Sequence, residues 1–489
     1  MIPLTALRDR LAHVGLLAEA PGTIDHIQVN RLASDSRAVT PGTLFVAVRG
    51  AQTDGHLFIE KAVQNEAIAI VGEAFPADVR APRLQVHDST QALAQLAAAF
   101  HGDPADALTM VGVTGTNGKT TTATLIQHML RILGANAGRI GTTGYDAGHG
   151  AVETTHTTPD TLELHRILAE MVENGCTACA MEVSSHALAQ GRVHGIGYAA
   201  GVFTNLTRDH LDYHGTFADY LAAKKLLFDG LAADATAIYN VDDPASTGMT
   251  DGIAARHLSY GQAASADLRF EILANRLDGL HLLLDGHDQT FRLVGAFNAY
   301  NLAAAYGVGL ALGYDADAVL AALADAPPVA GRFEQIRFAD GTTVIVDYAH
   351  TPDALENVLQ TIRATMPEGA TLWTVFGCGG DRDPAKRPMM GGIAERYSDR
   401  AIVTSDNPRT EDPEAILAAI RDGMTRPTDA ISLVDRRAAI EEAERQAAPG
   451  DVVLIAGKGH ETYQIIGTEK RHFDDREEVR RAFAARGAT

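Results

Sequence analysis

A glycine-rich segment at residues 112–121, Gly-Val-Thr-Gly-Thr-Asn-Gly-Lys-Thr-Thr, carries the strongest chemical signal in the sequence. It follows an apolar run at residues 108–113 and opens a predicted helix over about residues 119–133, the context that a phosphate-binding loop requires. Glycines let backbone N–H groups approach phosphates closely, and the helix N-terminus adds positive potential. Lys119 can neutralise terminal phosphates, and the Thr120 hydroxyl can hold Mg²⁺. The segment therefore predicts a nucleotide site.

The spacing of this segment departs from the general phosphate-binding loop. Five residues rather than four separate Gly112 from Gly118, and residue 113 is valine. The alternative is a simple glycine turn between a strand and a helix, which leaves the Lys-Thr pair without a role.

Two further polar residues follow apolar strands and could reach the same place. Glu182 ends the apolar run at residues 178–183, where a carboxylate could ligate Mg²⁺. His210 follows the run at residues 199–204. Taken alone, each is more often a polar side chain at a strand end whose hydrogen bonds are already made within the protein. Together with the loop, the two residues form a candidate metal centre.

A predicted helix at residues 217–228 carries two adjacent lysines. Lys225 is interpreted as a solvated lysine. Lys224 shares the apolar face of the helix, and a buried lysine must lose its charge or gain a partner. A neutral amine can react with CO₂ to give a carbamate, which would be an oxygen ligand for Mg²⁺, although the helical spacing alone does not require this chemistry.

The chain alternates short apolar runs with amphipathic runs, which is typical of an α/β fold. Its 489 residues suffice for about three domains. Turns at Gly102-Asp103-Pro104 and Pro327-Pro328 predict domains at residues 1–103, 104–327 and 328–489. The first contains a strand, helix and strand over residues 43–72, and the second has hairpin-like strands over residues 268–293.

The third predicted domain repeats a pattern of apolar strand, polar loop and helix four times. Ligands of open parallel sheets bind outside the carboxyl ends of the strands. The loops there, dense in charge and glycine, should line one crevice; they cover residues 347–350, 377–387, 406–409 and 457–461.

The net charge, the cysteine count and the lengths of the apolar runs argue against several classes of protein. The formal charge of −21 argues against a general nucleic-acid or anionic-membrane binder. Three cysteines in a long chain make a disulfide framework improbable, and Cys176-Thr-Ala-Cys179 lies in an apolar run that reads as a buried strand. The charged N-terminus does not read as a signal peptide, and no apolar run reaches about 18 residues. We expect a cytoplasmic protein in a reducing compartment.

Taken together, the motifs resemble the Mur ligases of bacterial peptidoglycan synthesis, over a match from about Ser34 to Glu461. The segments that carry the resemblance are, in order, GVTGTNGKTT, HTTPD, MEVSSHALAQGRV, NLTRDHLDYHG, DYAHTPDAL, FGCGGDRDPAKRP, SDNPRT and GKGHETYQ. The resemblance implies a small N-terminal α/β domain for the UDP-sugar, a central P-loop ATPase-like parallel sheet, and a C-terminal Rossmann-like domain for the amino acid.

The resemblance also implies a reaction. It is greatest for the family members that add the third amino acid of the stem peptide, which join an amino acid to the D-glutamate of UDP-N-acetylmuramoyl-L-alanyl-D-glutamate. ATP phosphorylates the carboxylate, the amine attacks the acyl phosphate, and ADP and phosphate are released. We expect a monomeric enzyme of cell-wall biogenesis, and so of cell shape and cell division, that needs Mg²⁺ and binds neither nucleic acid nor membrane.

By motif position, the family's functional residues fall in three sets. The catalytic and metal set is Lys119, Glu182, His210 and a carbamylated Lys224, with Thr120 as a further Mg²⁺ ligand. The nucleotide set is Gly115, Thr116, Asn117, Gly118, Lys119, Thr120, Thr121, Asn301, Arg332 and Asp347. The UDP-sugar-peptide set is Ser34, Ser36, Thr157, Thr158, Ser184, Gln190 and Arg192. Thr158-Pro159 also reads as a helix N-cap with proline at the first helical position, a favourable anion site.

The choice of amino acid rests on residues 406–409, Asp-Asn-Pro-Arg. They resemble the signature of family members that accept meso-diaminopimelate, which differs from L-lysine by a second carboxylate beside its far amine. A guanidinium binds a carboxylate bidentately, so Arg409 would favour diaminopimelate and be left unpaired by lysine. The remaining amino-acid set is Arg382, Asp406, Asn407, Pro408, Gly457 and Glu461, of which Glu461 can hold an ammonium group.

Three alternatives stay open at this stage. A surface turn closed by Pro408 would remove the argument for diaminopimelate. Another ligase of the superfamily, one that adds D-alanyl-D-alanine or a folylpolyglutamate synthetase, would keep the nucleotide loop but lack the Asp-Asn-Pro-Arg segment. A nucleotide-binding switch or assembly protein would need Lys119 and Thr120 but neither this segment nor Gly-Lys-Gly-His-Glu.

Overall fold

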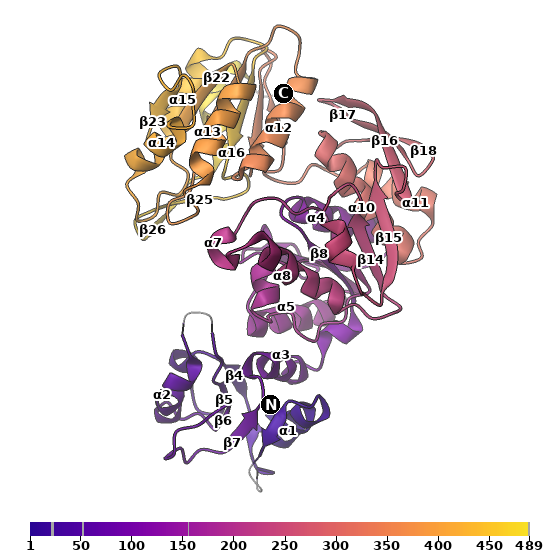
Figure 1. The fold of residues 1–489 in the computed structure, drawn as a ribbon, viewed down its shortest axis with the longest axis vertical. Helices are drawn as coiled ribbons and strands as arrows, with labels where there is room; N and C mark the ends of the chain where they lie inside the picture. The colour runs from indigo at the N-terminus through magenta and orange to yellow at the C-terminus, as the bar shows by residue number, and fades with distance from the viewer. Residues whose placement is uncertain (21–23, 51–52, 155, 488–489) are drawn as a thin grey trace.

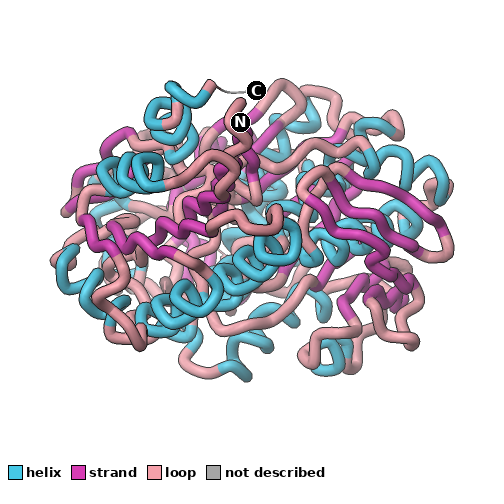
Figure 2. Tube along the Cα trace, turned by 90° about the horizontal axis from the view of Figure 1, so that it is seen from above, coloured by secondary structure: helices cyan, strands magenta, loops and turns pink. Residues whose placement is uncertain are grey.

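The mixed α/β fold of the chain is built around three main β-sheets, seen in a computed structural model that describes residues 1–20, 24–50, 53–154 and 156–487. Figure 1 shows the sheets in three successive lobes along the long axis, and Figure 2, seen from above, shows helices on either side of the strands. Within the described residues, no helix is both long enough and apolar enough to cross a membrane.

The first lobe is a five-stranded sheet in the order β2-β7-β6-β5-β4, in which β2 alone is antiparallel to its neighbour. The predicted strand-helix-strand unit is present, and a 3₁₀ turn directly precedes its helix. The elements are β1 (Ile2–Pro3), α1 (Leu4–His13), β2 (Leu17–Glu19), β3 (Gln28–Val29), β4 (Arg31–Ala33), β5 (Thr43–Val46), α2 (Ile59–Gln64), β6 (Ala69–Gly72), β7 (Arg83–Val86) and α3 (Ser89–Phe100).

The central sheet has eleven strands in the order β11-β10-β9-β12-β8-β13-β14-β15-β16-β17-β18. The parallel strands are β8 (Thr109–Thr114), β9 (Ala137–Gly141), β12 (Ala178–Glu182), β13 (Ala200–Phe203), β14 (Thr236–Asn240), β15 (Arg256–Gly261) and β16 (Leu268–Arg276). Antiparallel strands extend both edges: β10 (Gly144–Asp146), β11 (Ala151–Val152), β17 (Gly279–Leu284) and β18 (His287–Phe291). The predicted hairpins are therefore present.

Helices cover both faces of the central sheet, which explains why its strands read as continuous apolar runs. Alternate residues of β8 point to opposite faces: Val111 and Val113 pack with α4 and α10, and Met110 packs with α5 and α8. The helices are α4 (Lys119–Ile132), α5 (Thr161–Glu173), α6 (Ser185–Ala189), α7 (Leu211–His214), α8 (Phe217–Asp229), α9 (Ser246–Thr250), α10 (Ala296–Ala311) and α11 (Ala316–Ala324). Cys176 and Cys179 are buried free thiols, in agreement with a structural role.

The third lobe is a six-stranded sheet in the order β19-β20-β24-β21-β22-β23, parallel except for β19. Its strands are β19 (Glu334–Arg337), β20 (Thr343–Asp347), β21 (Leu372–Phe376), β22 (Arg400–Thr404), β23 (Ile431–Leu433) and β24 (Val452–Ala456). Its helices are α12 (Pro352–Thr365), α13 (Lys386–Tyr397), α14 (Pro413–Arg421), α15 (Arg436–Gln446) and α16 (Asp475–Ala482). The carboxyl ends of β20, β24, β21 and β22 are adjacent, so the loops after them share one edge.

The predicted fourth repeat of strand, loop and helix is wrong. After β24 the chain forms a hairpin, β25 (Tyr463–Ile466) and β26 (Glu469–His472), before α16 begins. Gly467 turns this hairpin with a positive φ of 62°, a conformation that favours glycine. The predicted domain boundaries, at residues 103 and 327, fall in the segments that connect one main sheet to the next. They stay predictions.

Candidate active site

The glycine-rich loop joins β8 to α4, at the centre of the eleven-stranded sheet. Gly118 has a positive φ of 87°, and a Cβ on it would lie 2.5 Å from Asn301 Oδ1. The loop is held by the segment after β13: the Asn117 amide donates to Asn205 Oδ1 at 2.9 Å, and the Thr204 hydroxyl donates to the Asn117 carbonyl at 2.6 Å. These contacts shape the loop before any ligand binds.

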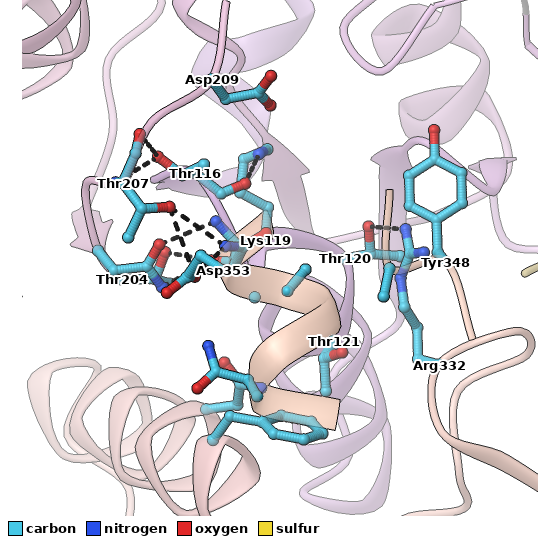
Figure 3. Close-up of a pocket in the computed structure, with 18 of the residues that line it drawn as sticks. Thr116, Lys119, Thr120, Thr121, Thr204, Thr207, Asp209, Arg332, Tyr348 and Asp353 are labelled. Atoms are coloured by element: carbon cyan, nitrogen blue, oxygen red, sulfur yellow. Dashed lines mark hydrogen bonds between the residues drawn. The ribbon is translucent and has the colours of Figure 1, made fainter. Parts of the chain in front are cut away.

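A cavity of about 460 Å³ opens above this loop, between the central and C-terminal sheets. Figure 3 shows the Lys119 amine bonded to the backbone of Thr116, with Thr120 beside Arg332 and Tyr348. The predicted residues that line the cavity are Thr116, Asn117, Gly118, Lys119, Thr120, Thr121, Thr157, Glu182, His210, Asn301, Arg332 and Asp347. The chain thus brings most of the predicted nucleotide and metal residues together.

Two lysine amines converge on one carbonyl oxygen of the loop. Lys119 Nζ donates to the Gly115 carbonyl at 2.9 Å and to the Thr116 carbonyl at 2.8 Å, and Lys224 Nζ donates to the same Gly115 oxygen at 2.7 Å. Lys224 is only 1% exposed, as its place on the apolar helix face predicts. Burial lowers its pKa well below the usual value, and the charge of Lys119 lowers it further.

Glu182, at the end of β12, accepts three hydrogen bonds from two other segments of the chain. Its carboxylate accepts from the Thr120 hydroxyl at 3.0 Å, the Thr142 hydroxyl at 3.0 Å and the Thr142 amide at 2.8 Å. Arg332 Nη2 donates to the same Thr120 hydroxyl at 3.1 Å. A carboxylate, a hydroxyl and a guanidinium therefore surround the point where the phosphate loop enters its helix.

No group of three or more His, Cys, Asp or Glu side chains is arranged to hold a metal within the described ranges. Mg²⁺ does not need such a cage, because it keeps several waters and binds through one or two carboxylates and substrate phosphates. Glu182 and the Thr120 hydroxyl beside a phosphate loop suit that pattern. The residues present therefore fit a phosphate-bound Mg²⁺.

His210 stands at the start of α7 with a positive φ of 55°, and its Nε2 lies 3.4 Å from Asp209 Oδ2. Burial lowers the pKa of His210, which keeps the imidazole neutral near pH 7. Its ring contacts His186 edge-on, at 4.8 Å between centroids. A neutral imidazole is the form that can bind a metal.

Three further residues of the predicted nucleotide set make different kinds of contact: Asn301, Arg332 and Asp347. Asn301 accepts from the Thr122 hydroxyl at 3.2 Å, and the Arg332 guanidinium stacks 4.1 Å from the Tyr348 ring centroid. One nitrogen of Arg332 is buried without a partner, so it is available to a ligand. Asp347 instead accepts from the backbone amides of Phe333 and Ala349, at 2.6 and 2.7 Å, which uses both carboxylate oxygens.

The predicted N-cap at Thr158 is wrong. The cap of α5 is Asp160, whose side chain accepts from the Glu163 amide. The Thr158 hydroxyl instead donates to the Glu182 carbonyl at 2.8 Å and accepts from the Ser184 amide at 3.0 Å. The predicted phosphate-type anion site at a Thr158 cap is therefore not formed.

Of the predicted UDP-sugar-peptide residues, Thr157 alone lines the cavity, and the others lie outside its lining. Ser184 caps α6 by accepting from the Ala187 amide. Gln190 Oε1 accepts from Arg192, which also donates to the Thr158 carbonyl at 2.8 Å. Ser34 is exposed and Ser36 is buried, both just after β4 in the first lobe.

The predicted amino-acid residues cluster at the shared loop edge of the C-terminal sheet. Asn407 Nδ2 donates to Glu461 Oε2 at 3.0 Å, and the buried Lys458 amine bridges the same two side chains. A Cβ on Gly379 would lie 3.0 Å from Arg409 Nη1 and 3.7 Å from Arg382 Cγ. The two predicted arginines therefore lie side by side, with Asp406, Asn407, Pro408, Gly457 and Glu461 on the adjoining loops.

The geometry can be compared with known proteins. The family models match in three parts: "Mur ligase family, catalytic domain" over residues 28–101, "Mur ligase middle domain" over 113–309, and "Mur ligase, glutamate ligase domain" over 331–459. A relative from Cytophaga hutchinsonii, named UDP-N-acetylmuramoyl-L-alanyl-D-glutamate--2,6-diaminopimelate ligase, is 46% identical over 96% of this chain and 97% of its own. The chain belongs to the Mur ligase family. It is accordingly a ligase.

Solved structures agree with the Mur ligase fold. A structure titled as a UDP-N-acetylmuramoyl-L-alanyl-D-glutamate--2,6-diaminopimelate ligase is 35% identical, with a TM-score of 0.67 over 96% of this chain and 97% of that one. A MurF ligase from Thermotoga maritima in complex with ADP shares the fold at 20% identity, with a TM-score of 0.64 over 94% and 98% of the two chains.

Several residues of the Mur ligase cavity were not predicted. The additional lining residues include Thr142, Thr204, Asn205, Thr207, Asp209, Phe297, Tyr300, Tyr348, His350, Asp353 and Asn357. Asp353 approaches from α12, and its carboxylate accepts from Asn117 Nδ2 at 2.8 Å across the domain boundary. Asp209 and Tyr348 lie inside quoted motifs, which is the signal that could have identified them.

Proposed function

We propose that this Mur ligase uses ATP to join meso-diaminopimelate to the D-glutamyl carboxylate of UDP-N-acetylmuramoyl-L-alanyl-D-glutamate. The observation that carries the proposal is the cavity in which the glycine-rich loop faces Arg332, Tyr348 and Asp353 from the C-terminal part of the chain. The name of the 46%-identical relative supports the choice of both substrates.

The reaction needs an activated carboxylate, because a carboxylate is a poor electrophile. A D-glutamyl oxygen attacks the γ-phosphorus of ATP, the bond to the β-phosphate oxygen breaks, and ADP leaves. The amine nitrogen then attacks the acyl carbon, inorganic phosphate leaves with the bonding electrons, and the nitrogen loses a proton to solvent or a nearby base. Each step brings anions together, so nearby cations lower the barrier.

The residue roles follow from the contacts. Lys119 and Arg332 would neutralise the triphosphate, while Thr120, Glu182 and His210 would hold Mg²⁺, which screens the phosphate charge. The other loop residues, Gly115, Thr116, Asn117, Gly118 and Thr121, would present amides and hydroxyls to the nucleotide. Asn301 and Asp347 would border its sugar and base.

The peptide substrate would extend from the cavity toward the first lobe. Thr157 lines the cavity and bonds Thr142, so it would lie near the reacting carboxylate. The remaining proposed contacts are Ser34, Ser36, Thr158, Ser184, Gln190 and Arg192. Domains at 1–103, 104–327 and 328–489, a monomeric state and a cytoplasmic location stay predictions.

A turnover assay with purified protein, ATP, Mg²⁺ and the nucleotide dipeptide tests the function. Phosphate release should depend on both the dipeptide and meso-diaminopimelate. Faster turnover with L-lysine or D-alanyl-D-alanine would contradict the proposed specificity. A rate of ATP hydrolysis that does not depend on the dipeptide or on meso-diaminopimelate would favour a nucleotide switch.

Arg409→Lys should raise the KM for meso-diaminopimelate about tenfold to a hundredfold, because an ammonium cannot form two parallel bonds to a carboxylate. Arg409 Nη1 already donates to the Gly380 carbonyl at 2.7 Å, which orients the guanidinium. The KM for ATP should stay within about twofold. Steady-state kinetics measures both, and an unchanged KM for diaminopimelate would refute this role.

Glu182→Gln should raise the Mg²⁺ concentration needed for half-maximal activity and lower kcat by about a hundredfold, because an amide is a weaker ligand for a hard cation. The fold should persist, since the glutamine oxygen can still accept from the Thr142 amide while its NH₂ group donates to the Thr120 hydroxyl. A Mg²⁺ titration of activity gives the result, and a curve identical to that of the unaltered protein would exclude the carboxylate as a ligand.

A further inference from the structure

Arg436 is a fully buried guanidinium beneath the C-terminal loops, paired with an equally buried Asp475. Both side chains are 0% exposed. Arg436 Nε and Nη2 donate to the two carboxylate oxygens of Asp475, each at 2.7 Å, a bidentate arrangement.

The stability of the fold does not by itself explain why this ion pair is buried. Removing two charges from water costs free energy that apolar side chains of similar volume would avoid. Arg436 is also the first residue of α15, where the helix dipole disfavours a cation. Burial lowers the pKa of Arg436, but Asp475, with Asp406 and Glu461, raises it on balance, so the charge is kept.

The remaining donors of the guanidinium reach two backbone carbonyls, each directly before an amino-acid loop. Nη2 donates to the Ala456 carbonyl at 3.0 Å, and Nη1 to the Ser405 carbonyl at 3.4 Å. Ala456 ends β24, and Ser405 follows β22. These strands are not neighbours, because β21 lies between them, so no direct ladder of backbone bonds sets the distance between their loops.

Above the guanidinium the two loops touch closely. A Cβ on Gly457 would lie 2.5 Å from Asp406 Oδ2, and the Gln464 side chain donates to the Asp406 carbonyl at 2.8 Å. Asn407 bonds both Lys458 and Glu461. A small shift of one loop would therefore move the groups of the other.

We propose that Arg436, held by Asp475, is a positioning residue for amino-acid binding, because it fixes residues 406–409 relative to residues 457–461. The proposal rests on the proposed function, in which these loops bind diaminopimelate. Arg436 itself touches no substrate.

The test is the double variant Arg436→Met/Asp475→Leu, which removes the carbonyl bonds without leaving a buried charge alone. The KM for meso-diaminopimelate should rise at least about tenfold, because ångström-scale misplacement of binding groups is costly. The KM values for ATP and the nucleotide dipeptide should stay within about twofold. An unchanged KM for diaminopimelate overturns the proposal.

Arg486→Met is the matched control. Arg486 also bonds carboxylates and backbone carbonyls, but beside the amino ends of β20 and β24. Its guanidinium donates to the carboxylates of Asp340 and Glu444, at 3.0 and 3.1 Å, and to the backbone carbonyls of Glu444 and Ala447, at 2.6 and 2.8 Å. It should lower the thermal unfolding midpoint without changing the KM for diaminopimelate. Equal rises of that KM in both variants would show a merely structural role and overturn the proposal.

Hydrogen exchange of the substrate-free proteins gives a readout that does not depend on the proposed reaction. Exchange at residues 405–409 and 457–461 should be faster in the double variant than in Arg486→Met, and equal exchange would count against positioning. If the unaltered protein does not use diaminopimelate as a substrate, the proposed function is wrong. The exchange rates would still show whether Arg436 positions the two loops. If the double variant does not fold, Arg436→Lys takes its place. It must raise the KM for meso-diaminopimelate but not the KM values for ATP and the nucleotide dipeptide, and it must speed exchange at residues 405–409 and 457–461.

Discussion

Replacing Lys119 with alanine should lower kcat by at least about a thousandfold, the loss expected when a preorganised cation is removed from a transition state that develops charge. In the structure the Lys119 amine donates to two carbonyls of its own loop, at 2.8 and 2.9 Å. Terminal phosphates would offer it charged acceptors in place of these neutral ones. Burial lowers the pKa of Lys119, and an approaching triphosphate would favour its charged form.

Lys225→Ala is the control for this prediction. Lys225 is a neighbouring lysine of the same domain that pairs with Asp229 one turn further along α8, away from the loop. Single-turnover phosphate release, measured with saturating ATP, should be lost in Lys119→Ala and kept in Lys225→Ala. Retention of most activity without Lys119 would remove the phosphate role of the loop and, with it, the proposed nucleotide site.

Local patterns were enough to predict the strands and the loops that follow them. The loops predicted to begin at residues 377 and 457 follow directly on β21 and β24, because both strands are apolar runs flanked by polar loops. The general rule for open parallel sheets then placed residues 406–409 and 457–461 at one edge. The phosphate loop was predictable for the same reason, since its function resides in consecutive residues.

Contacts between distant segments could not be predicted from the sequence. Thr142 and Glu182 are far apart in the chain, and only the order of β9, β12 and β8 brings them together. Asp353 reaches Asn117 because α12, after the C-terminal strand β20, packs close to the loop after β8, a contact that no local pattern encodes. The cap at Asp160 displaced the predicted cap at Thr158 because both residue types suit the position and tertiary bonding to Ser184 decided between them.

Lys224→Ala should abolish turnover, because we propose that Lys224 acts as a carbamate. Lys119 and Lys224 donate to a single oxygen, that of Gly115, so two ammonium groups there would repel each other. Burial and the charge of Lys119 lower the pKa of Lys224 well below its usual value, which favours the neutral amine. A neutral amine can add to CO₂ and lose a proton, which replaces a second cation with an anion able to pair with Lys119 or Mg²⁺.

Carbamylation can be tested separately from loss of activity, because it adds a carbon atom from CO₂ to the Lys224 amine. Protein incubated with ¹³C-bicarbonate should show a carbamate carbon resonance that is absent in Lys224→Ala and present in Lys225→Ala. Activity should fall in CO₂-depleted buffer and return when bicarbonate is added, and Lys224→Arg should not respond, because its guanidinium stays charged. Full activity without CO₂, together with no resonance in the unaltered protein, would mean that Lys224 works as a neutral amine bonded to Gly115, and the Mg²⁺ site would then have to be completed by phosphate oxygens and water.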